Sequence, residues 1–466
     1  MKSSSRHLAA LLVFLLPTLV AASGGAQPKR TEGDQYWQEL FSTYPLNRQV
    51  SDLALYNGML VAVGGFTEAG GRPLNRVGIF DGEMWHSVGG GTNDYTYDVE
   101  EYEGGLIVGG TFTQAGGQPI RYLARWTGSD WESMGYVDDT VTCIYKPTQS
   151  DDLYIGGVFE VVDGMGCHYI ARWDGESWHP LGPGTGWIVH AIQEYQGDLY
   201  VGGLFTYAGG ECVKYIARWD GYNWYPLSGG LDDLVLSLFV YDGLLIVGGN
   251  FMQTNDGLTV NHIASWNGEE WGALGPGLIL SRGGHVGALT EHDGQLIAGG
   301  QFDYAGALLA KCIACWNGQE WSNLGSGIGG SYVKALLSHE SDLYVGGWFQ
   351  TAGGDTSENM ACWSEDMTVV QDVEVDIEGV ESYPNPFSSK VTIRLSLPGT
   401  TPVKAAVYDI AGRLVKEIGM IARSRGAASL AWDGTDRNGR RVPSGVYTIM
   451  ISDGRHHATE KVTLMR

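Results

Sequence analysis

The stretch VHAIQEYQGDLYVGGLFTYAGGECVKYIARWDGYNWYPLSGG, residues 189–230, decides how this chain folds. It reads as four short strands, at residues 189–195, 199–205, 215–219 and 224–227. The last two flank Asp220-Gly221, a dipeptide suited to the positive φ angles of a tight hairpin turn. Short strands joined by such turns predict one four-stranded antiparallel sheet.

This stretch is one copy of a repeat. Paired glycines followed by phenylalanine occur seven times, 45 to 51 residues apart, beginning at Gly64, Gly109, Gly156, Gly202, Gly248, Gly299 and Gly346. The composition, with 70 glycines, 16 tryptophans and 24 tyrosines in 466 residues, is typical of many short strands and turns. We therefore expect an all-β protein built on a seven-bladed β-propeller.

The ends of the repeat array suggest how the ring closes. The fourth strand of a unit carries Trp-x-x-apolar, and Trp37 to Leu40 has this form although no repeat precedes it. The seventh unit ends at Trp363 without a fourth strand of its own. Since an open strand edge promotes aggregation, we expect residues 37–40 to close the last blade of a propeller that spans 33–366.

The remaining segments differ from the repeats in character. Residues 1–26 have the charged, apolar and then small-residue order of a secretory signal peptide, and no other segment is apolar enough to span a membrane. Residues 381–466 hold 13 Lys and Arg against 7 Asp and Glu, which leaves 16 against 46 for the rest of the chain. We expect a linker at 367–380 and a separate small β-sandwich at 381–466.

Two resemblances follow from these residues. The units, with their VGGxFTxAGG and IARWDGxxW motifs, resemble kelch-type repeats and especially Rax2-like surface proteins. The motifs SYPNPF (382–387), VYDIAGRLVKEI (407–418) and WDGTDRNGRRVPSGVYTIMI (432–451) resemble the C-terminal sorting domain of type IX secretion substrates, which overlaps with the Ig-like domain of flagellar hook-capping proteins. This second resemblance implies a bacterial protein that passes the periplasm and is secreted or held at the outer cell surface. The alternative is an Ig-like module without a sorting role.

Few residues point to chemistry. The acidic repeat region argues against nucleic acid or an anionic membrane as partner, because phosphate binding needs clustered Lys and Arg. Cys312 and Cys315 have the spacing of half a zinc site, but on a strand they face opposite sides. Cys167 and Cys212 lie in equivalent loops and could form a disulfide in an oxidising compartment. The sequence predicts no cofactor and no metal site.

Function should therefore reside on the long loops, which strand direction places on one face of the propeller. The inter-blade loops supply flat aromatics and carboxylates, and the position two residues before Ile-Ala-Arg-Trp is polar in every unit. The candidate ligand-binding residues are Trp187, Asp232, Asp233, Asp138, Asp139, Tyr97 and Tyr332 from the first group and Arg121, His168 and Lys214 from the second. The leading interpretation is a non-enzymatic binding or adhesion protein for a carbohydrate or protein ligand. The alternative is a secreted hydrolase or lyase that acts on polysaccharide with carboxylates on the same face.

Overall fold

The computed structural model describes residues 33–280, 283–364, 381–397, 403–409, 414–421, 426–437, 439–452 and 457–465. The signal peptide expected at 1–26 and the linker expected at 367–380 lie outside these residues. Residue contacts divide the chain into two units, with the boundary between Asp366 and Met367. Among the described residues, no helix reaches the length and hydrophobicity needed to cross a bilayer.

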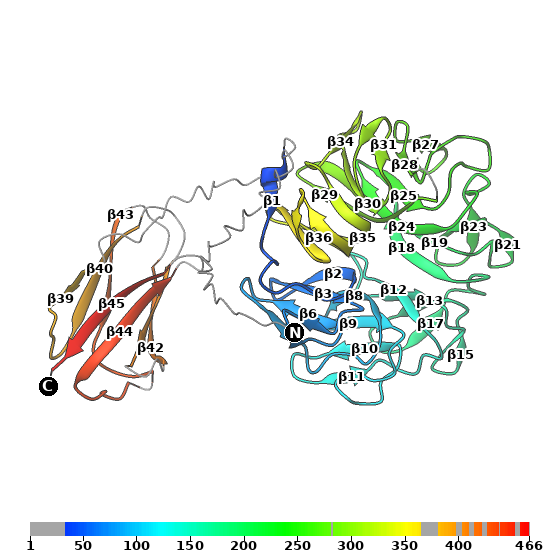
Figure 1. The fold of residues 1–466 in the computed structure, drawn as a ribbon. Coiled ribbons are helices and arrows are strands. Elements are labelled where there is room, and N and C mark those ends of the chain that lie inside the picture. The colour runs from blue at the N-terminus through cyan, green and yellow to red at the C-terminus, as the bar shows by residue number, and fades with distance from the viewer. Residues whose placement is uncertain are drawn as a thin grey trace, which may run out of the picture. The chain divides into compact units, whose positions relative to one another are not determined.

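The described part of the first unit contains seven antiparallel sheets of the same design, which we call blades 1 to 7 in chain order (Figure 1). From inner to outer strand, blade 1 is β2 (Val50–Tyr56), β3 (Met59–Gly64), β6 (Val77–Phe80) and β7 (Trp85–Ser87). Blade 2 is β8 (Thr96–Tyr102), β9 (Gly105–Gly110), β10 (Leu123–Trp126) and β11 (Trp131–Ser133), and blade 3 is β12 (Val141–Tyr145), β13 (Leu153–Gly157), β16 (Ile170–Trp173) and β17 (Trp178–Pro180).

Blades 4 to 6 repeat this order. Blade 4 is β18 (Val189–Tyr195), β19 (Asp198–Gly203), β22 (Ile216–Trp219) and β23 (Trp224–Pro226). Blade 5 is β24 (Val235–Tyr241), β25 (Leu244–Gly249), β26 (Ile263–Trp266) and β27 (Trp271–Ala273). Blade 6 is β29 (His285–His292), β30 (Gln295–Gln301), β33 (Ile313–Trp316) and β34 (Trp321–Asn323).

Blade 7 joins the two ends of the unit. Its strands are β35 (Ile328–His339), β36 (Asp342–Ala352), β38 (Met360–Ser364) and, outermost, β1 (Trp37–Gln38), while β37 (Asp355–Thr356) pairs with β36. A single 3-10 turn, η1 (Asp34–Tyr36), precedes β1. The loops carry the short ribbons β4 (Glu68–Ala69) with β5 (Arg72–Pro73), β14 (Val161–Val162) with β15 (Met165–Gly166), β20 (Tyr207–Ala208) with β21 (Glu211–Cys212), and β28 (Leu278–Ile279) with β31 (Tyr304–Ala305) and β32 (Leu308–Leu309).

The inner strands form a closed ring. Each packs on the inner strand of the next blade, in the order β2, β8, β12, β18, β24, β29 and β35, and β35 packs on β2. Such a cyclic order of four-stranded sheets is the arrangement of a β-propeller. The all-β class expected from the sequence is confirmed.

The recurring residues of the sequence hold neighbouring blades together. The phenylalanine after each glycine pair is fully buried, and a side chain at Gly202 would collide with Val235 of the next blade. Five outer-strand tryptophans donate from Nε1 to a backbone carbonyl of the preceding blade as follows: Trp131 to Val88 O at 3.1 Å, Trp178 to Met134 O at 2.6 Å, Trp224 to Leu181 O at 3.0 Å, Trp271 to Leu227 O at 3.3 Å and Trp321 to Leu274 O at 2.8 Å. The residues that recur in the repeat are thus those that pack neighbouring blades together.

Trp37 makes the same contact from the N-terminal segment. β1 pairs antiparallel with β38, with Trp37 opposite Trp363, and Trp37 Nε1 donates to Leu324 O at 3.3 Å. The Trp37 and Trp363 rings pack edge to face with centroids 5.2 Å apart. The N-terminal segment therefore occupies the outer-strand position of blade 7.

The second unit consists of two antiparallel sheets with a core of its own. One sheet is β39 (Glu381–Tyr383), β40 (Val391–Leu397) and β43 (Gly426–Trp432), and the other is β42 (Leu414–Ile421), β41 (Val403–Tyr408), β44 (Gly445–Ser452) and β45 (His457–Leu464). Trp432 is fully buried between Phe387 and Tyr447, with ring centroids 5.6 and 4.9 Å away. Two packed sheets with this core form an Ig-like β-sandwich.

Candidate functional site: a loop face and a central channel

Strand direction separates two faces of the first unit. The loops that join the second strand to the third, and those that join one blade to the next, lie on the same side, which we call the loop face. The short turns within each pair of hairpin strands lie on the other side, the hairpin face. The two faces differ in what their side chains do.

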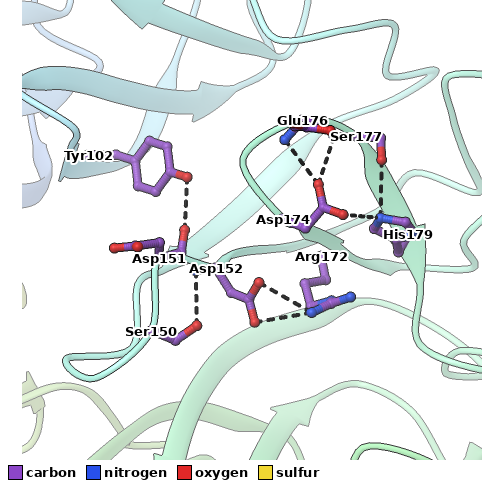
Figure 2. A network of polar contacts seen from close by, with 9 residues as sticks. All are labelled: Tyr102, Ser150, Asp151, Asp152, Arg172, Asp174, Glu176, Ser177 and His179. Carbon is purple, nitrogen blue, oxygen red and sulfur yellow. Dashed lines mark hydrogen bonds and ion pairs between the residues drawn. The ribbon is translucent and has the colours of Figure 1, made fainter.

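On the hairpin face, polar side chains mostly stabilise the turns themselves, as blade 3 shows (Figure 2). Asp174 accepts hydrogen bonds from the backbone N–H groups of Glu176 and Ser177 at 3.0 and 2.8 Å and contacts His179 Nε2 at 2.6 Å. These bonds hold the pKa of the Asp174 carboxyl well below its usual range. Asp81 and Asp220 bond the same backbone groups in blades 1 and 4. The carboxylates of this face thus serve the scaffold.

On the loop face, all four candidate carboxylates also bond the scaffold. Asp138 Oδ1 accepts the N–H groups of Glu160 and Val161, both at 3.0 Å, and Asp232 Oδ1 accepts those of Met252 and Gln253 at 2.9 and 3.2 Å. Asn47 and Asn93 make the same bonds before blades 1 and 2. Asp139 and Asp233 each accept the N–H of the following residue at 2.7 Å. One oxygen of each carboxylate therefore holds a loop in place.

The polar position before the third strand has a backbone explanation. His168 and Lys214 have φ angles of 46° and 48°, and their carbonyls accept hydrogen bonds from Thr185 and Leu231 of the next inter-blade loop. Both side chains are exposed, and Lys214 Nζ donates to Asn255 Oδ1 at 2.9 Å. Arg121 is also exposed and lines a hollow of about 240 Å³ with Tyr136. At His168 and Lys214 the polarity reflects a solvent-exposed left-handed turn that links two loops.

The three candidate aromatics lie in different surroundings. Trp187 is 48% exposed, and its ring packs on Tyr169 with centroids 5.7 Å apart. Tyr332 is half-buried and donates from its hydroxyl to Gln49 Oε1 at 2.7 Å. Tyr97 lines a central cavity. The structure therefore does not bring the candidate residues together in one site.

Large apolar side chains are exposed mainly on the loop face. Among the described residues of the first unit, those on the hairpin face are Met59 and Tyr222. Those on the loop face are Tyr136, Trp187, Leu204, Tyr207, Met252, Leu258, Tyr304, Leu308, Leu309 and Trp348, and Leu40, just after β1, is also exposed. Trp187 lies between Gly186, whose N–H bonds Tyr207 O at 2.7 Å, and Ile188, whose carbonyl accepts from Leu204 N at 2.9 Å. We call Trp187, Leu204 and Tyr207 the blade 4 patch.

The axis of the ring holds a cavity of about 460 Å³. Each inner strand has a β-bulge near its start, between Val50 and Asp52 in blade 1 and at the equivalent place in the others. Bulges redirect a side chain, and the bulged residues all line the cavity. They are Ser51, Tyr97, Thr142, His190, Leu236, Gly287 and Lys334, which we call the channel ring.

Sequence reasoning missed the channel ring, except for Tyr97, although a signal was present. The residue before each ring position is valine, or threonine in blade 2, whereas the ring position itself holds seven different residue types. Residues that recur in every copy serve the packing of the scaffold. A position that differs in every copy therefore indicates a role other than packing. The pattern was visible without the structure, but its place on the axis was not.

Two carboxyl groups follow the ring on adjacent blades. Asp52 Oδ2 accepts the N–H of Val99 and Asp98 Oδ2 accepts that of Ile144, both at 3.0 Å, so each connects its blade to the next. The two carboxyls also hydrogen bond each other. Burial raises the pKa of both, and the neighbouring Asp52 carboxyl raises that of Asp98 well above its usual range. Two carboxyl groups this close disfavour each other's ionisation.

Lys334 affects the pKa values of two histidines near the cavity. Burial lowers the pKa of its ammonium group, although Asp52 and Asp98 oppose the shift. Burial, and then the Lys334 charge, lower the pKa of His190 and of His285 to about 4. Both imidazoles are therefore neutral at pH 7.

Glu100, on β8, gives a testable pH effect. Burial, and then the Asp52 charge, raise the pKa of Glu100 to about 7 from an ordinary 4.5. Its ionisation therefore opposes folding, with no cost below about pH 4.5 and the full cost above about pH 7. We expect Glu100→Gln to raise the free energy of unfolding by about 1–3 kcal/mol more at pH 8 than at pH 4.5, measured by urea denaturation. Glu101→Gln, at the exposed neighbour, is the control, and an effect of Glu100→Gln that is equal at both pH values would contradict this assignment.

The cysteines make no disulfide among the described residues. All six are free, with Cys167 buried and Cys212 exposed, so the structure does not form the Cys167–Cys212 bond considered from the sequence. Cys312 is buried and Cys315 is half-buried, with its Sγ 2.9 Å from Ser322 Oγ. In the part of the chain that the structure describes, no group of three or more metal-ligating side chains is found.

Comparison with known proteins places one part of the chain. Residues 387–456, which lie within the second unit, match the FlgD Ig-like domain family. No curated protein matches the chain. The Ig-like domain expected at the C-terminus is confirmed, and the kelch-type or Rax2-like assignment of the repeats stays a prediction.

Solved structures give weaker likenesses. PorZ, a bacterial surface component of the type IX secretion system of Porphyromonas gingivalis, is 14% identical with a TM-score of 0.43, over 91% of this chain and 60% of PorZ. Dimeric latent PorU from the same organism is 14% identical with a TM-score of 0.18, over 70% of this chain and 33% of PorU. An arabinoxylan arabinofuranohydrolase from Bacillus subtilis, of glycoside hydrolase family 43, is 8% identical with a TM-score of 0.22, over 91% and 96% of the two chains. At these scores the likenesses carry no argument about function.

Proposed function

We propose that this chain is a secreted or cell-surface protein that binds a carbohydrate or protein ligand through its loop face. The observation that carries the proposal is the uneven exposure of large apolar side chains, which gather on the loop face. Exposed apolar and aromatic groups are costly in water and commonly mark interaction surfaces. Flat rings such as Trp187 and Tyr207 suit stacking on a sugar ring or packing on a protein side chain.

We assign export to the second unit. The SYPNPF motif and the two later motifs resemble type IX sorting domains, and the match of residues 387–456 to an Ig-like family supports a module of the same kind. A sorting domain that folds on its own suits this role, because export machinery has to recognise it whatever domain precedes it. The chain would then pass the periplasm and act outside the cell.

A secreted hydrolase or lyase is the second candidate, and the Asp52–Asp98 pair is the observation that favours it. In glycosidases that use two carboxyls, these groups stand about 5–5.5 or 6.5–9.5 Å apart on either side of the scissile bond. Asp52 and Asp98 hydrogen bond each other and also bond the next blade, so they do not flank a bond in this way. Binding therefore accounts better for the geometry.

Replacing two side chains of the blade 4 patch tests the proposed function. We expect Trp187→Ala combined with Tyr207→Ala to weaken ligand binding at least about tenfold, because truncated aromatic anchors often cost 2 kcal/mol or more. The melting temperature should move by less than about 2 °C because both side chains are exposed. The measurement is a panel of purified glycans, polysaccharides and surface proteins of the native host, scored for both binding and cleavage.

Tyr222→Ala is the matched control. Tyr222 is 85% exposed and lies in blade 4, but on the hairpin face. We expect its replacement to leave affinity unchanged. The loop face is the wrong surface if Tyr222→Ala weakens binding and the double variant does not, and turnover that disappears in Asp98→Asn would favour the hydrolase.

A further inference from the structure

The channel ring divides into a polar arc and an apolar side. Lys334, Ser51, Tyr97, Thr142 and His190 follow one another on blades 7, 1, 2, 3 and 4, so hydrogen-bonding groups line a continuous arc. Leu236 and Gly287 occupy blades 5 and 6. A molecule in this cavity would meet donors and acceptors along one side and hydrocarbon on the other.

The polar arc has unused hydrogen-bonding capacity. Within the part of the chain that the structure describes, neither the Lys334 ammonium nor the His190 ring forms a hydrogen bond or an ion pair with the protein. Half-buried polar groups are costly when they lack partners, so side chains of this kind are retained where something else bonds them. Lys334 offers three donors, and the neutral His190 offers one donor and one acceptor.

The cavity lining holds groups of both charge types. Lys334 supplies an amine, and Asp52 and Asp98 supply carboxyl groups. An anion would meet the carboxyl pair, and a cation would meet the ammonium group. The occupant that fits both is neutral and rich in hydroxyl groups, with an apolar face.

We propose that the central cavity binds one neutral sugar residue, with its hydroxyls on the arc from Lys334 to His190 and its apolar face on Leu236. A volume of about 460 Å³ is in the range of small-molecule pockets. Thr111, Thr140 and Val158 also line the cavity and lie at the loop-face ends of their strands, so the sugar enters from the loop face. Entry from the loop face rests on the proposed function. The inference narrows the proposed ligand from a carbohydrate or protein to a carbohydrate.

Filling the cavity from blade 6 tests the proposal. A Cβ at Gly287 would meet His285 at 3.5 Å and Lys334 Cδ at 3.8 Å, which are ordinary contacts, and Leu236 shows that the scaffold accepts leucine at this ring position. We expect Gly287→Leu to weaken binding of a methyl glycoside at least tenfold without lowering the melting temperature. Glu291→Leu, which introduces a leucine at an exposed position of the same strand outside the cavity lining, is the matched control and should bind like the parent.

The probes are methyl α- and β-glycosides of glucose, galactose, mannose and N-acetylglucosamine, titrated calorimetrically at millimolar concentrations into the chain that begins at residue 27. Lys334→Met should also weaken glycoside binding. Because this change removes a hydrogen-bond donor without filling the cavity, it distinguishes loss of the donor from blockage of the cavity. The proposal is wrong if no glycoside binds, or if Gly287→Leu binds as well as the parent. The variant that combines Trp187→Ala and Tyr207→Ala should bind the glycoside normally and long polysaccharides weakly. This variant therefore tests the proposed function of the loop face independently of the cavity.

Discussion

A chain that begins at Tyr44 is expected to lose more than about 3 kcal/mol of unfolding free energy and to aggregate. The truncation removes β1, which pairs with β38 at the edge of blade 7, and leaves that edge open. It also removes Trp37, which is 7% exposed and belongs to the core that includes Trp363 and Leu343. Loss of a buried tryptophan alone costs about 3–5 kcal/mol.

Two substitutions isolate the cause of this loss. Trp37→Ala removes the ring contact with Trp363 and the hydrogen bond to Leu324 O but leaves the chain length unchanged. Gln38→Ala changes the exposed neighbour on the same strand and should be close to neutral. Urea denaturation followed by tryptophan fluorescence compares the three proteins with the parent. Closure by the N-terminal strand is disproved if the truncated chain unfolds at the same urea concentration as the parent.

The sequence was sufficient for the fold because the same contacts recur in each blade. Glycine pairs, the following phenylalanines and the outer tryptophans each have one packing role, and repetition makes those roles visible in the sequence. Trp37 could be recognised for the same reason, since its position relative to the next glycine pair matches that of Trp85 and Trp271. The structure pairs this strand with β38.

The candidate site was harder to predict because a position can vary between copies for two reasons, tolerance of many residues or a specific role. His168 and Lys214 differ from their counterparts because a left-handed, solvent-exposed turn accepts many polar residues. Asp138 and Asp232 were chosen as carboxylates, but the backbone N–H groups that they bond are not visible in a sequence. Lys334 and His190 lie on bulges, where the alternation of a strand is interrupted, so a period of two gives no sign that they face the axis.

Deletion of residues 381–466 should stop export at the periplasm. The core of the second unit is made of its own residues, among them Phe387, Trp432 and Ile449, and the cores of blades 1 and 7 contain none of them. We therefore expect the shortened chain to keep the melting temperature of the first unit. In the native host, with its signal peptide intact, it should accumulate in the periplasm while the parent appears outside the cell, as quantified by immunoblots of the separated fractions.

Transfer of the segment tests whether it is sufficient for export. Residues 367–466 fused to a periplasmic reporter should carry that reporter out of the cell, and the same fusion with Trp432→Ala should not, because the fully buried Trp432 ring fills the centre of the sandwich. Lys390→Ala, at an exposed position of the same unit, controls for substitution as such. If the shortened chain reaches the medium as efficiently as the parent, the second unit has no sorting role. A fusion that stays in the periplasm while the shortened chain also stays there would show that the segment is necessary but needs the first unit, since recognition would then depend on both.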